Sequence, residues 1–205
     1  MLCRSVANNA IIAAIQLPDK YMITGKFADK NQLFSGIRSA LEKKIKLVQF
    51  RAHHLSTDTY FEYAKKIHEL CLQHGASLML NCRTEDYVKY YAYNYSEGLH
   101  LSVKELKDFS TPQFGKKILI SASTHNHEEL TVARQKQVDF CVLSPVMKTR
   151  SHPDANPLGW EKFKRLCRSA TVPVFALGGI TLDDIAKCKN MGGHGISAIG
   201  AFWLV

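Results

Sequence analysis

Residue types suited to acid–base chemistry or to anion binding stand where β-rich runs of this sequence end. His125 directly follows Ser123 and Thr124 at the end of one such run. A neutral imidazole in that place can move a proton near pH 7, and the alternative is an ordinary hydrogen-bonded histidine. We take His125 as the candidate catalytic residue.

A glycine pair marks a candidate phosphate site. Gly178 and Gly179 come directly after a predicted strand and before a predicted helix, and Ile199-Gly200 ends the last predicted strand. Glycine lets backbone N–H groups approach an anion, and a helix N-terminus adds positive potential. The alternative is that the pair only makes a tight turn. We expect Gly178, Gly179, Ile199 and Gly200 to bind phosphate.

Two further polar side chains belong to the second predicted strand. Gln49 and Arg51 are two residues apart and therefore share one face. A buried Arg or Gln needs a partner, and a ligand anion would suit both. The alternative for Arg51 is a structural salt bridge to a carboxylate such as Glu105.

The longest loop runs from Ser144 to Pro157 and contains Met147, Lys148 and Arg150. Such a loop could close over a ligand with its two cations as anion contacts. The alternative is a mobile basic surface loop.

The elements that must position these residues alternate along the chain, with short β-rich runs followed by amphipathic stretches. Ser56 or Thr57 is a plausible helix N-cap, Gly75 ends that helix, and Thr181 is expected to cap the last one. Strands are predicted at 21–24, 45–51, 78–81, 98–101, 118–121, 140–143, 172–177 and 195–199, and helices at 30–43, 57–74, 84–94, 103–107, 127–136, 160–168 and 181–191.

This alternation predicts the α/β class, with parallel strands and right-handed crossovers. A single (β/α)8 TIM barrel is the expected architecture, and an open doubly wound sheet is the alternative. We divide the chain into an N-terminal extension at 1–17 and the barrel domain at 18–205. The printed chain ends at Val205, so the eighth helix is expected to be truncated, and the extension is hypothesised to cover the gap.

Composition suits one domain with a sizeable core, because 46% of the 205 residues are hydrophobic. The net charge of +9 favours anionic small molecules. No nucleic acid is expected as a partner, because the basic residues are scattered. The six cysteines lack CxxC spacing, which argues against zinc, and the chain has no long apolar run, so we expect no membrane partner and a cytoplasmic location. The oligomeric state stays open, a homo-oligomer included.

Short motifs spread over the chain resemble the thiamin phosphate synthase/TenI superfamily. They cover about residues 20–203, and the Pro-Leu-Gly-Trp and Ala-Phe-Trp stretches are most similar to the TenI-type domain often fused to Nudix hydrolases. The motifs are Tyr-Met-Ile-Thr at 21–24, Val-Gln-Phe-Arg at 48–51, Leu-Asn at 80–81, Gly-Leu-His-Leu at 98–101, Ser-Ala-Ser-Thr-His at 121–125, Leu-Ser-Pro-Val at 143–146, Pro-Leu-Gly-Trp at 157–160, Ala-Leu-Gly-Gly-Ile at 176–180 and Gly-His-Gly-Ile-Ser-Ala-Ile at 193–199.

The synthase of this superfamily joins a pyrimidine diphosphate to a thiazole phosphate, with Mg²⁺ on the diphosphate. The resemblance implies that the thiazole phosphate lies at Gly179, Ile199 and Gly200. It implies that the pyrimidine diphosphate lies near Gln49, Arg51 and Asn81, with Ser123, Thr149 and Ser151 nearby.

The sequence departs from the synthase pattern at the metal site and at two lysines. Cys82 stands where the pattern has a metal-binding Asp, and Glu105 is the nearest equivalent of the second. His53 and His152 replace the two lysines. Mg²⁺ prefers oxygen ligands, so no metal site is predicted apart from the weak candidate Glu105.

TenI-type proteins keep the barrel, and the characterised kind isomerises a thiazole carboxylate phosphate with a histidine after strand five. The resemblance therefore implies a thiazole tautomerase with His125 as its acid and base and with no cofactor. The alternatives are a thiamin phosphate synthase, the only case in which Mg²⁺ is expected, and a non-catalytic ligand-binding or regulatory barrel. The expected partner is a phosphorylated thiazole or pyrimidine.

Overall fold

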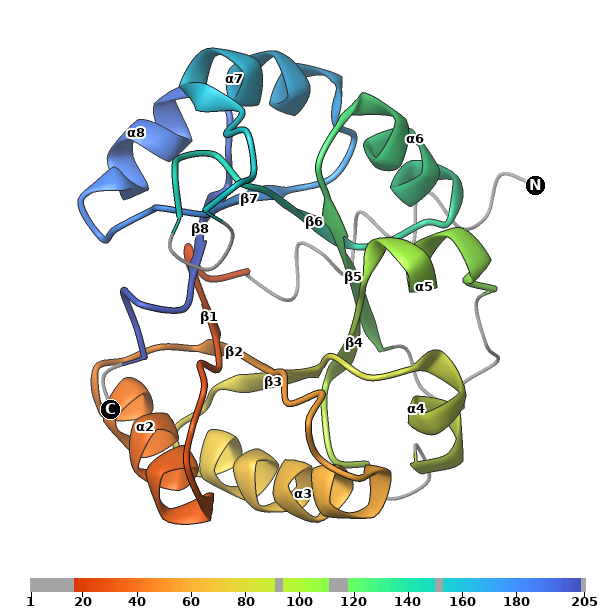
Figure 1. Cartoon of the computed structure of the whole chain (residues 1–205), viewed down its shortest axis with the longest axis vertical. Helices are drawn as coiled ribbons and strands as arrows, with labels where there is room; N and C mark the ends of the chain where they lie inside the picture. The colour runs from red at the N-terminus through yellow and green to blue at the C-terminus, as the bar shows by residue number, and fades with distance from the viewer. Residues whose placement is uncertain (1–16, 91–93, 111–117, 150–152, 204–205) are drawn as a thin grey trace.

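The fold is a closed barrel of eight parallel strands in the order β1 to β8. A computed structural model describes residues 17–90, 94–110, 118–149 and 153–203. Figure 1 shows the helices surrounding the ring of strands. The predicted TIM barrel is confirmed, and the open sheet is excluded because β1 pairs with both β2 and β8.

The strands and helices alternate as predicted, with most ends within two residues of the expected ones. The strands are β1 (Lys20–Ile23), β2 (Leu47–Phe50), β3 (Ser77–Leu80), β4 (Gly98–Leu101), β5 (Leu119–Thr124), β6 (Phe140–Leu143), β7 (Val174–Leu177) and β8 (Gly195–Ala198). The helices are α2 (Lys30–Glu42), α3 (Thr57–Gln73), α4 (Thr84–Tyr90), α5 (Val103–Asp108), α6 (His127–Gln135), α7 (Gly159–Ser169) and α8 (Asp184–Asn190).

Of the two predicted helix caps, the one at α3 is confirmed and the one at α8 is wrong. Ser56 caps α3 as predicted, because its hydroxyl accepts the Thr59 N–H at 3.3 Å. Thr181 is not the cap of α8, which begins later, at Asp184. Instead the Thr181 N–H and hydroxyl both donate to the Asp184 carboxylate, at 3.0 and 3.2 Å.

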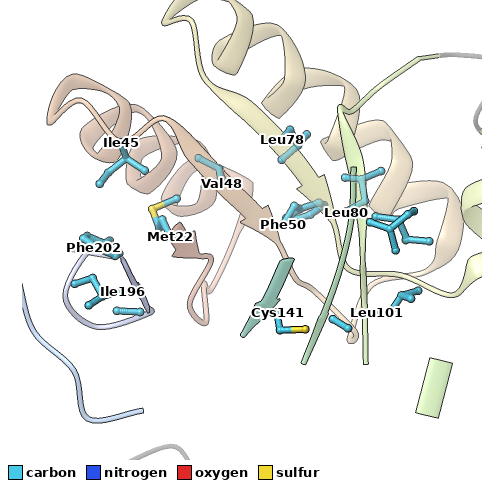
Figure 2. Packing of buried hydrophobic residues seen from close by; sticks show 14 of the residues in the cluster. Met22, Ile45, Val48, Phe50, Leu78, Leu80, Leu101, Cys141, Ile196 and Phe202 are labelled. Carbon is cyan, nitrogen blue, oxygen red and sulfur yellow. The ribbon is translucent and has the colours of Figure 1, made fainter. Parts of the chain in front are cut away.

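Side chains on each strand alternate between two cores. One core fills the barrel and is largely aromatic and aliphatic, comprising Tyr21, Leu47, Met79, Leu119, Phe140, Val142 and Phe175. The other lies between strands and helices, and Figure 2 shows part of it around Met22, Val48, Phe50 and Leu78. The filled interior leaves the strand ends as the surface where polar groups can gather.

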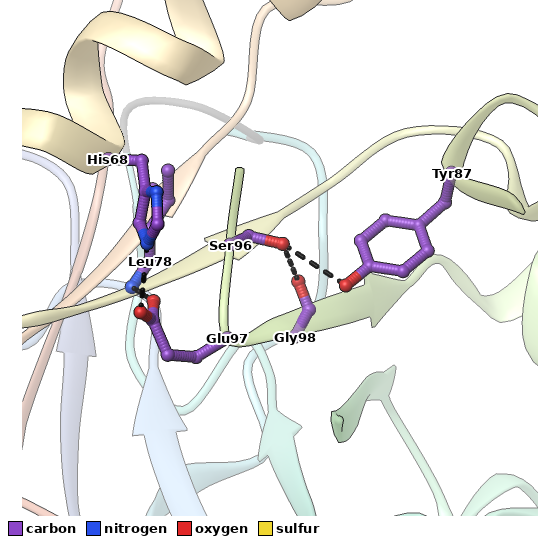
Figure 3. A network of polar contacts seen from close by, with 6 residues as sticks. All are labelled: His68, Leu78, Tyr87, Ser96, Glu97 and Gly98. Carbon is purple, nitrogen blue, oxygen red and sulfur yellow. Dashed lines mark hydrogen bonds and ion pairs between the residues drawn. The ribbon is translucent and has the colours of Figure 1, made fainter. Parts of the chain in front are cut away.

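Two acidic side chains extend strand pairing at the N-terminal end of the barrel. The Glu97 carboxylate accepts the Leu78 N–H at 2.6 Å, while the Glu97 N–H donates to the Leu78 carbonyl at 3.0 Å. The Asp139 carboxylate accepts the Ile120 N–H at 2.8 Å in the same way. The other Glu97 oxygen lies 3.0 Å from His68 Nε2, as Figure 3 shows. We call the Leu78–Glu97 pairing and its His68 contact the Glu97 bracket.

The segment after β8 closes against the start of the barrel. Trp203 is 8% exposed, its ring covers Gly25, and its indole N–H donates to the Lys26 carbonyl at 3.1 Å. Figure 1 shows this blue segment reaching the side of α2. The expected extension at 1–17 lies outside the described residues except for Leu17, so its covering role stays a prediction. No helix in the described ranges is long and apolar enough to cross a bilayer.

Candidate active site

Strand β5 carries a row of polar residues from the barrel core to its C-terminal mouth. Ser121 is fully buried, Ser123 is half-buried and His125 is exposed, and the spacing of two places them on one face. The strand is longer than predicted and ends at Thr124. His125 therefore directly follows the strand at the rim where barrel enzymes place their catalytic groups.

The His125 ring is held in one tautomer. Its Nδ1 lies 2.6 Å from the Ser144 carbonyl oxygen, which can only accept a hydrogen bond. Nδ1 therefore carries a hydrogen, and in the neutral ring the lone pair is on Nε2. An imidazole oriented in this way by a carbonyl can accept a proton at Nε2.

Below the mouth lies a chain of polar groups around His100, which the sequence analysis did not select, although it did select Gln49 and Ser123. His100 is 3% exposed, with Nδ1 2.8 Å from the Ser121 hydroxyl and Nε2 2.9 Å from the Ser123 hydroxyl. The Tyr21 hydroxyl lies 3.5 Å from the same Nδ1 and accepts from Gln49 Nε2 at 2.9 Å. A histidine inside an otherwise apolar strand is the signal that could have identified it.

Gln49 and Arg51 point to the same side but meet different surroundings. Gln49 is 1% exposed and its Nε2 donates to the Tyr21 hydroxyl, so part of this buried amide is satisfied without a ligand, and its role in substrate binding stays a prediction. Arg51 is exposed, and the described residues offer its guanidinium no ion-pair partner. The alternative of a salt bridge to Glu105 is therefore wrong.

The Arg51 charge acts on two histidines near it. Burial, and then the Arg51 charge, lower the pKa of His100 to about 3. The same two causes, in the same order, lower the pKa of His53. His100 is therefore neutral at physiological pH, and the mouth carries a cation that described carboxylates leave unpaired.

Asn81 is held at the end of β3 as a fixed amide. It is 6% exposed, and its Nδ2 donates to the His100 carbonyl at 2.9 Å. A fixed amide at a strand end suits the orientation of a ligand rather than proton transfer.

Cys82 and Glu105, which stand at the metal positions of the synthase pattern, are tested by their surroundings. One Glu105 oxygen accepts both the N–H and the hydroxyl of Thr84, at 3.0 and 2.9 Å. Burial, followed by the charges of Asp86 and Glu105, raises the pKa of the Cys82 thiol, and Asp86 is paired with Arg83 at 2.8 Å. Within the described residues no three His, Cys, Asp or Glu side chains gather around one point. These donors do not fit a carboxylate-held Mg²⁺.

The glycine corner after β7 packs against the loop after β6. Gly178 and Gly179 have φ angles of 99° and 64°, and a methyl group on Gly179 would overlap the Lys148 carbonyl. The Met147 N–H donates to the Gly178 carbonyl at 2.9 Å. The tight-turn alternative therefore accounts for both glycines, and phosphate binding by their N–H groups stays a prediction.

The second half of the expected phosphate site is open. Gly200 is exposed, and a methyl group there would meet nothing within 4 Å. Ile199 begins a turn in which its carbonyl accepts the Phe202 and Trp203 N–H groups, at 3.0 and 2.8 Å. Of the loop candidates, Lys148 is exposed and Thr149 is half-buried, whereas Arg150, Ser151 and His152 lie outside the described residues.

One interior hydroxyl stands apart from this chain of bonds. Ser197 lies on β8 between Ile196 and Ala198, which belong to the outer core, so its side chain faces the barrel interior. Its Oγ is the buried side-chain polar atom without a partner in the part of the chain that the structure describes. A small polar guest such as water would satisfy it.

The fold and this mouth define a (β/α)8 barrel with the layout of a barrel enzyme. The sequence model of the family described as thiamine monophosphate synthase matches residues 20–202. The chain belongs to this family, and the resemblance drawn from its motifs is confirmed. Membership places the chain in thiamin metabolism.

Individual relatives agree with the family. A putative thiamine-phosphate synthase 2 of Aquifex aeolicus is 29% identical over 188 residues, covering 92% of this chain and 99% of that protein. A thiamine-phosphate synthase of a Synechococcus species is 28% identical over 183 residues, covering 88% of this chain and 51% of that protein. This chain thus spans about half the length of that second relative.

A solved structure supports the fold. The thiamine phosphate pyrophosphorylase from Pyrococcus furiosus superposes with a TM-score of 0.71 at 23% identity, covering 89% of this chain and 86% of that one. At this identity the likeness shows the barrel and not the reaction.

Proposed function

We propose that this barrel is a thiamin phosphate synthase that joins a pyrimidine diphosphate to a thiazole phosphate. The observation that carries the proposal is the family match over residues 20–202, together with relatives whose names specify this reaction. The names favour coupling over the tautomerase that the TenI-like motifs predict. In the coupling step the thiazole nitrogen forms a bond to the pyrimidine methylene carbon, and the diphosphate leaves with the electrons of the broken C–O bond.

Cationic and polar side chains at the mouth suit these two anionic substrates. Arg51 and Lys148 are exposed cations that would bind the diphosphate. Asn81 and Ser123 would orient the pyrimidine, and the open backbone at Gly200 would accept the thiazole phosphate. The net charge of +9 attracts both substrates.

The family's synthases use Mg²⁺, but the donors described above do not fit it. We therefore assign no step to a metal, and the positive charge at the leaving group comes from Arg51 and Lys148. Cys82 and Glu105 have no role in binding the diphosphate in this proposal.

The second candidate is the tautomerase, and the His125 ring favours it. Nδ1 is fixed by the Ser144 carbonyl, so Nε2 is free to remove a proton from a thiazole ring and return it elsewhere. That reaction needs a phosphate site and a base and no diphosphate.

One experiment separates the candidates. In the first assay the full chain is incubated with both coupling substrates, once with Mg²⁺ and once with EDTA, and the thiamin phosphate formed is measured. In the second assay the chain is incubated with the thiazole carboxylate phosphate alone, and NMR follows its conversion to the isomer. The synthase is supported if the chain forms thiamin phosphate and Arg51→Ala lowers this rate at least tenfold. The control Arg38→Ala, on the exposed face of α2, should leave the rate unchanged.

The remaining outcomes reject the first proposal. The tautomerase is established if the chain converts the isomer without coupling, if His125→Asn abolishes this conversion, and if the nearby control His127→Asn retains it. Tight binding of thiazole phosphate with neither reaction establishes a ligand-binding barrel.

A further inference from the structure

The buried polar chain has a direction, and Tyr21 sets it. Gln49 Nε2 can only donate, so the Tyr21 oxygen accepts this bond at 2.9 Å and its own hydrogen must go elsewhere. Tyr21 is fully buried, and a buried hydroxyl without an acceptor would be costly. The remaining neighbours of the Tyr21 hydroxyl are His100 Nδ1 at 3.5 Å and the Ser121 hydroxyl.

Both acceptors lead to the same histidine tautomer. If Tyr21 donates to His100 Nδ1, that nitrogen carries no hydrogen. If Tyr21 donates to the Ser121 oxygen, the buried Ser121 hydrogen needs an acceptor of its own, and Nδ1 at 2.8 Å is the one that the described residues offer it, so Nδ1 again carries no hydrogen. A neutral imidazole has one N–H, so Nε2 carries it and donates to the Ser123 oxygen at 2.9 Å.

Ser123 is the last member of this chain and faces the mouth. Its oxygen receives the His100 hydrogen, and its own hydrogen has no acceptor among the residues that the structure describes. We propose that His100 is a positioning residue whose Nε2–H turns the Ser123 hydroxyl outward, so that Ser123 donates to an acceptor atom of the ligand. The acceptor is an unprotonated ring nitrogen or an anionic oxygen. The part of this inference that concerns the ligand contact of Ser123, the ligand half, rests on the proposed function. The part that concerns the His100 tautomer does not.

The tautomer is measured first, without substrate. In the full chain with ¹⁵N-labelled histidine, the His100 resonances are identified by their loss in His100→Gln or, if that variant does not fold, by their shift in Ser123→Ala. We expect hydrogen on Nε2 and a bare Nδ1 at pH 7. Hydrogen on Nδ1, or on both nitrogens, would reverse the chain of bonds and overturn the assignment.

A double-mutant cycle tests whether His100 acts through Ser123. One neutral hydrogen bond to the ligand corresponds to a loss of roughly three- to tenfold in kcat/KM, so we expect this from Ser123→Ala and from His100→Gln. The double variant should lose no more than Ser123→Ala alone, and the exposed control Ser35→Ala should lose nothing. Losses that multiply would make His100 a general structural residue and overturn the proposal.

The cycle also separates this inference from the proposed function. If the chain shows no coupling, the same variants are compared by their affinity for the pyrimidine diphosphate in calorimetry. Equal single and double losses in affinity then support the positioning role although the synthase proposal has failed. Affinity unchanged by Ser123→Ala, or no binding at all, overturns the ligand half.

Discussion

Removing the Glu97 side chain should destabilise the barrel from the end opposite the active site. Glu97→Ala leaves the fully buried Leu78 N–H without its 2.6 Å acceptor and also removes the contact to His68. The Glu97 and His68 side chains are only 31% and 13% exposed, so solvent replaces these bonds poorly. An unpaired buried donor together with a lost charged hydrogen bond costs about 3 kcal/mol.

The assay is equilibrium unfolding in urea, checked by thermal unfolding. A loss of about 3 kcal/mol corresponds to a fall in Tm of roughly 6–12 °C for a domain of this size. Glu62→Ala is the matched control, because its 2.6 Å pair with Lys66 lies on the exposed face of α3 and such pairs contribute little. A Glu97→Ala midpoint equal to that of the control would refute the view that the Glu97 bracket holds β3 to β4.

The same group gives a pH dependence with a definite sign. Burial acts to raise the pKa of Glu97, but the hydrogen bonds from His68 and from the Leu78 N–H outweigh it, and the pKa lies below its ordinary value. A carboxyl whose pKa is lower in the folded than in the unfolded state stabilises the fold at pH values above the unfolded-state pKa. This contribution is lost as the pH falls through the folded-state pKa. The difference in stability between wild type and Glu97→Gln should therefore shrink on acidification below about pH 4.5. A difference that grows on acidification would contradict the assignment.

Three further predictions concern the mouth and the closing turn. Gly179→Ala should lower the free energy of unfolding by about 2 kcal/mol or more, because φ is 64° and the methyl group has no room. Gly200→Ala should leave stability unchanged, so any loss of thiazole phosphate affinity in that variant comes from a lost ligand contact. Urea unfolding and calorimetry check the two variants. Trp203→Ala should cost about 3–5 kcal/mol in urea unfolding, because a buried ring and its bond to the Lys26 carbonyl are lost, and a cost near zero would contradict the closing role of the turn. Cys82 should react with iodoacetamide at pH 8 far more slowly than a small thiol, since its pKa is raised, and equal rates measured by mass spectrometry would contradict that.

The barrel could be predicted because each unit shows its period locally. Strands alternate between two cores and helices carry caps such as Ser56, and these signals depend only on neighbours in the sequence. Thr181 misled the prediction, because a residue that usually caps a helix here donates to Asp184 three residues on. Such local hydrogen bonds compete with helix capping, and residue type alone does not decide between them.

The site was predicted in part for a related reason. His125, Arg51 and Asn81 stand at strand ends, where topology alone brings them to one rim. The partners of Gln49 and His100 lie on other strands, 28 and 21 residues away along the chain, so no local pattern reveals them. The packing of the loop after β6 against the glycine pair likewise depends on the three-dimensional structure and not on a local sequence pattern.

The packing surface at Gly178 and Gly179 joins the corner after β7 to the loop after β6, two segments that are separate in the sequence. The loop after β6 hydrogen-bonds to Leu177 and Gly178 through the Val146 and Met147 N–H groups, and bulk on either glycine would push it away. Among homologues, an insertion at the foot of this loop should therefore accompany a change in the corner after β7. Engineering that transplants one segment without the other would lose both hydrogen bonds and this packing.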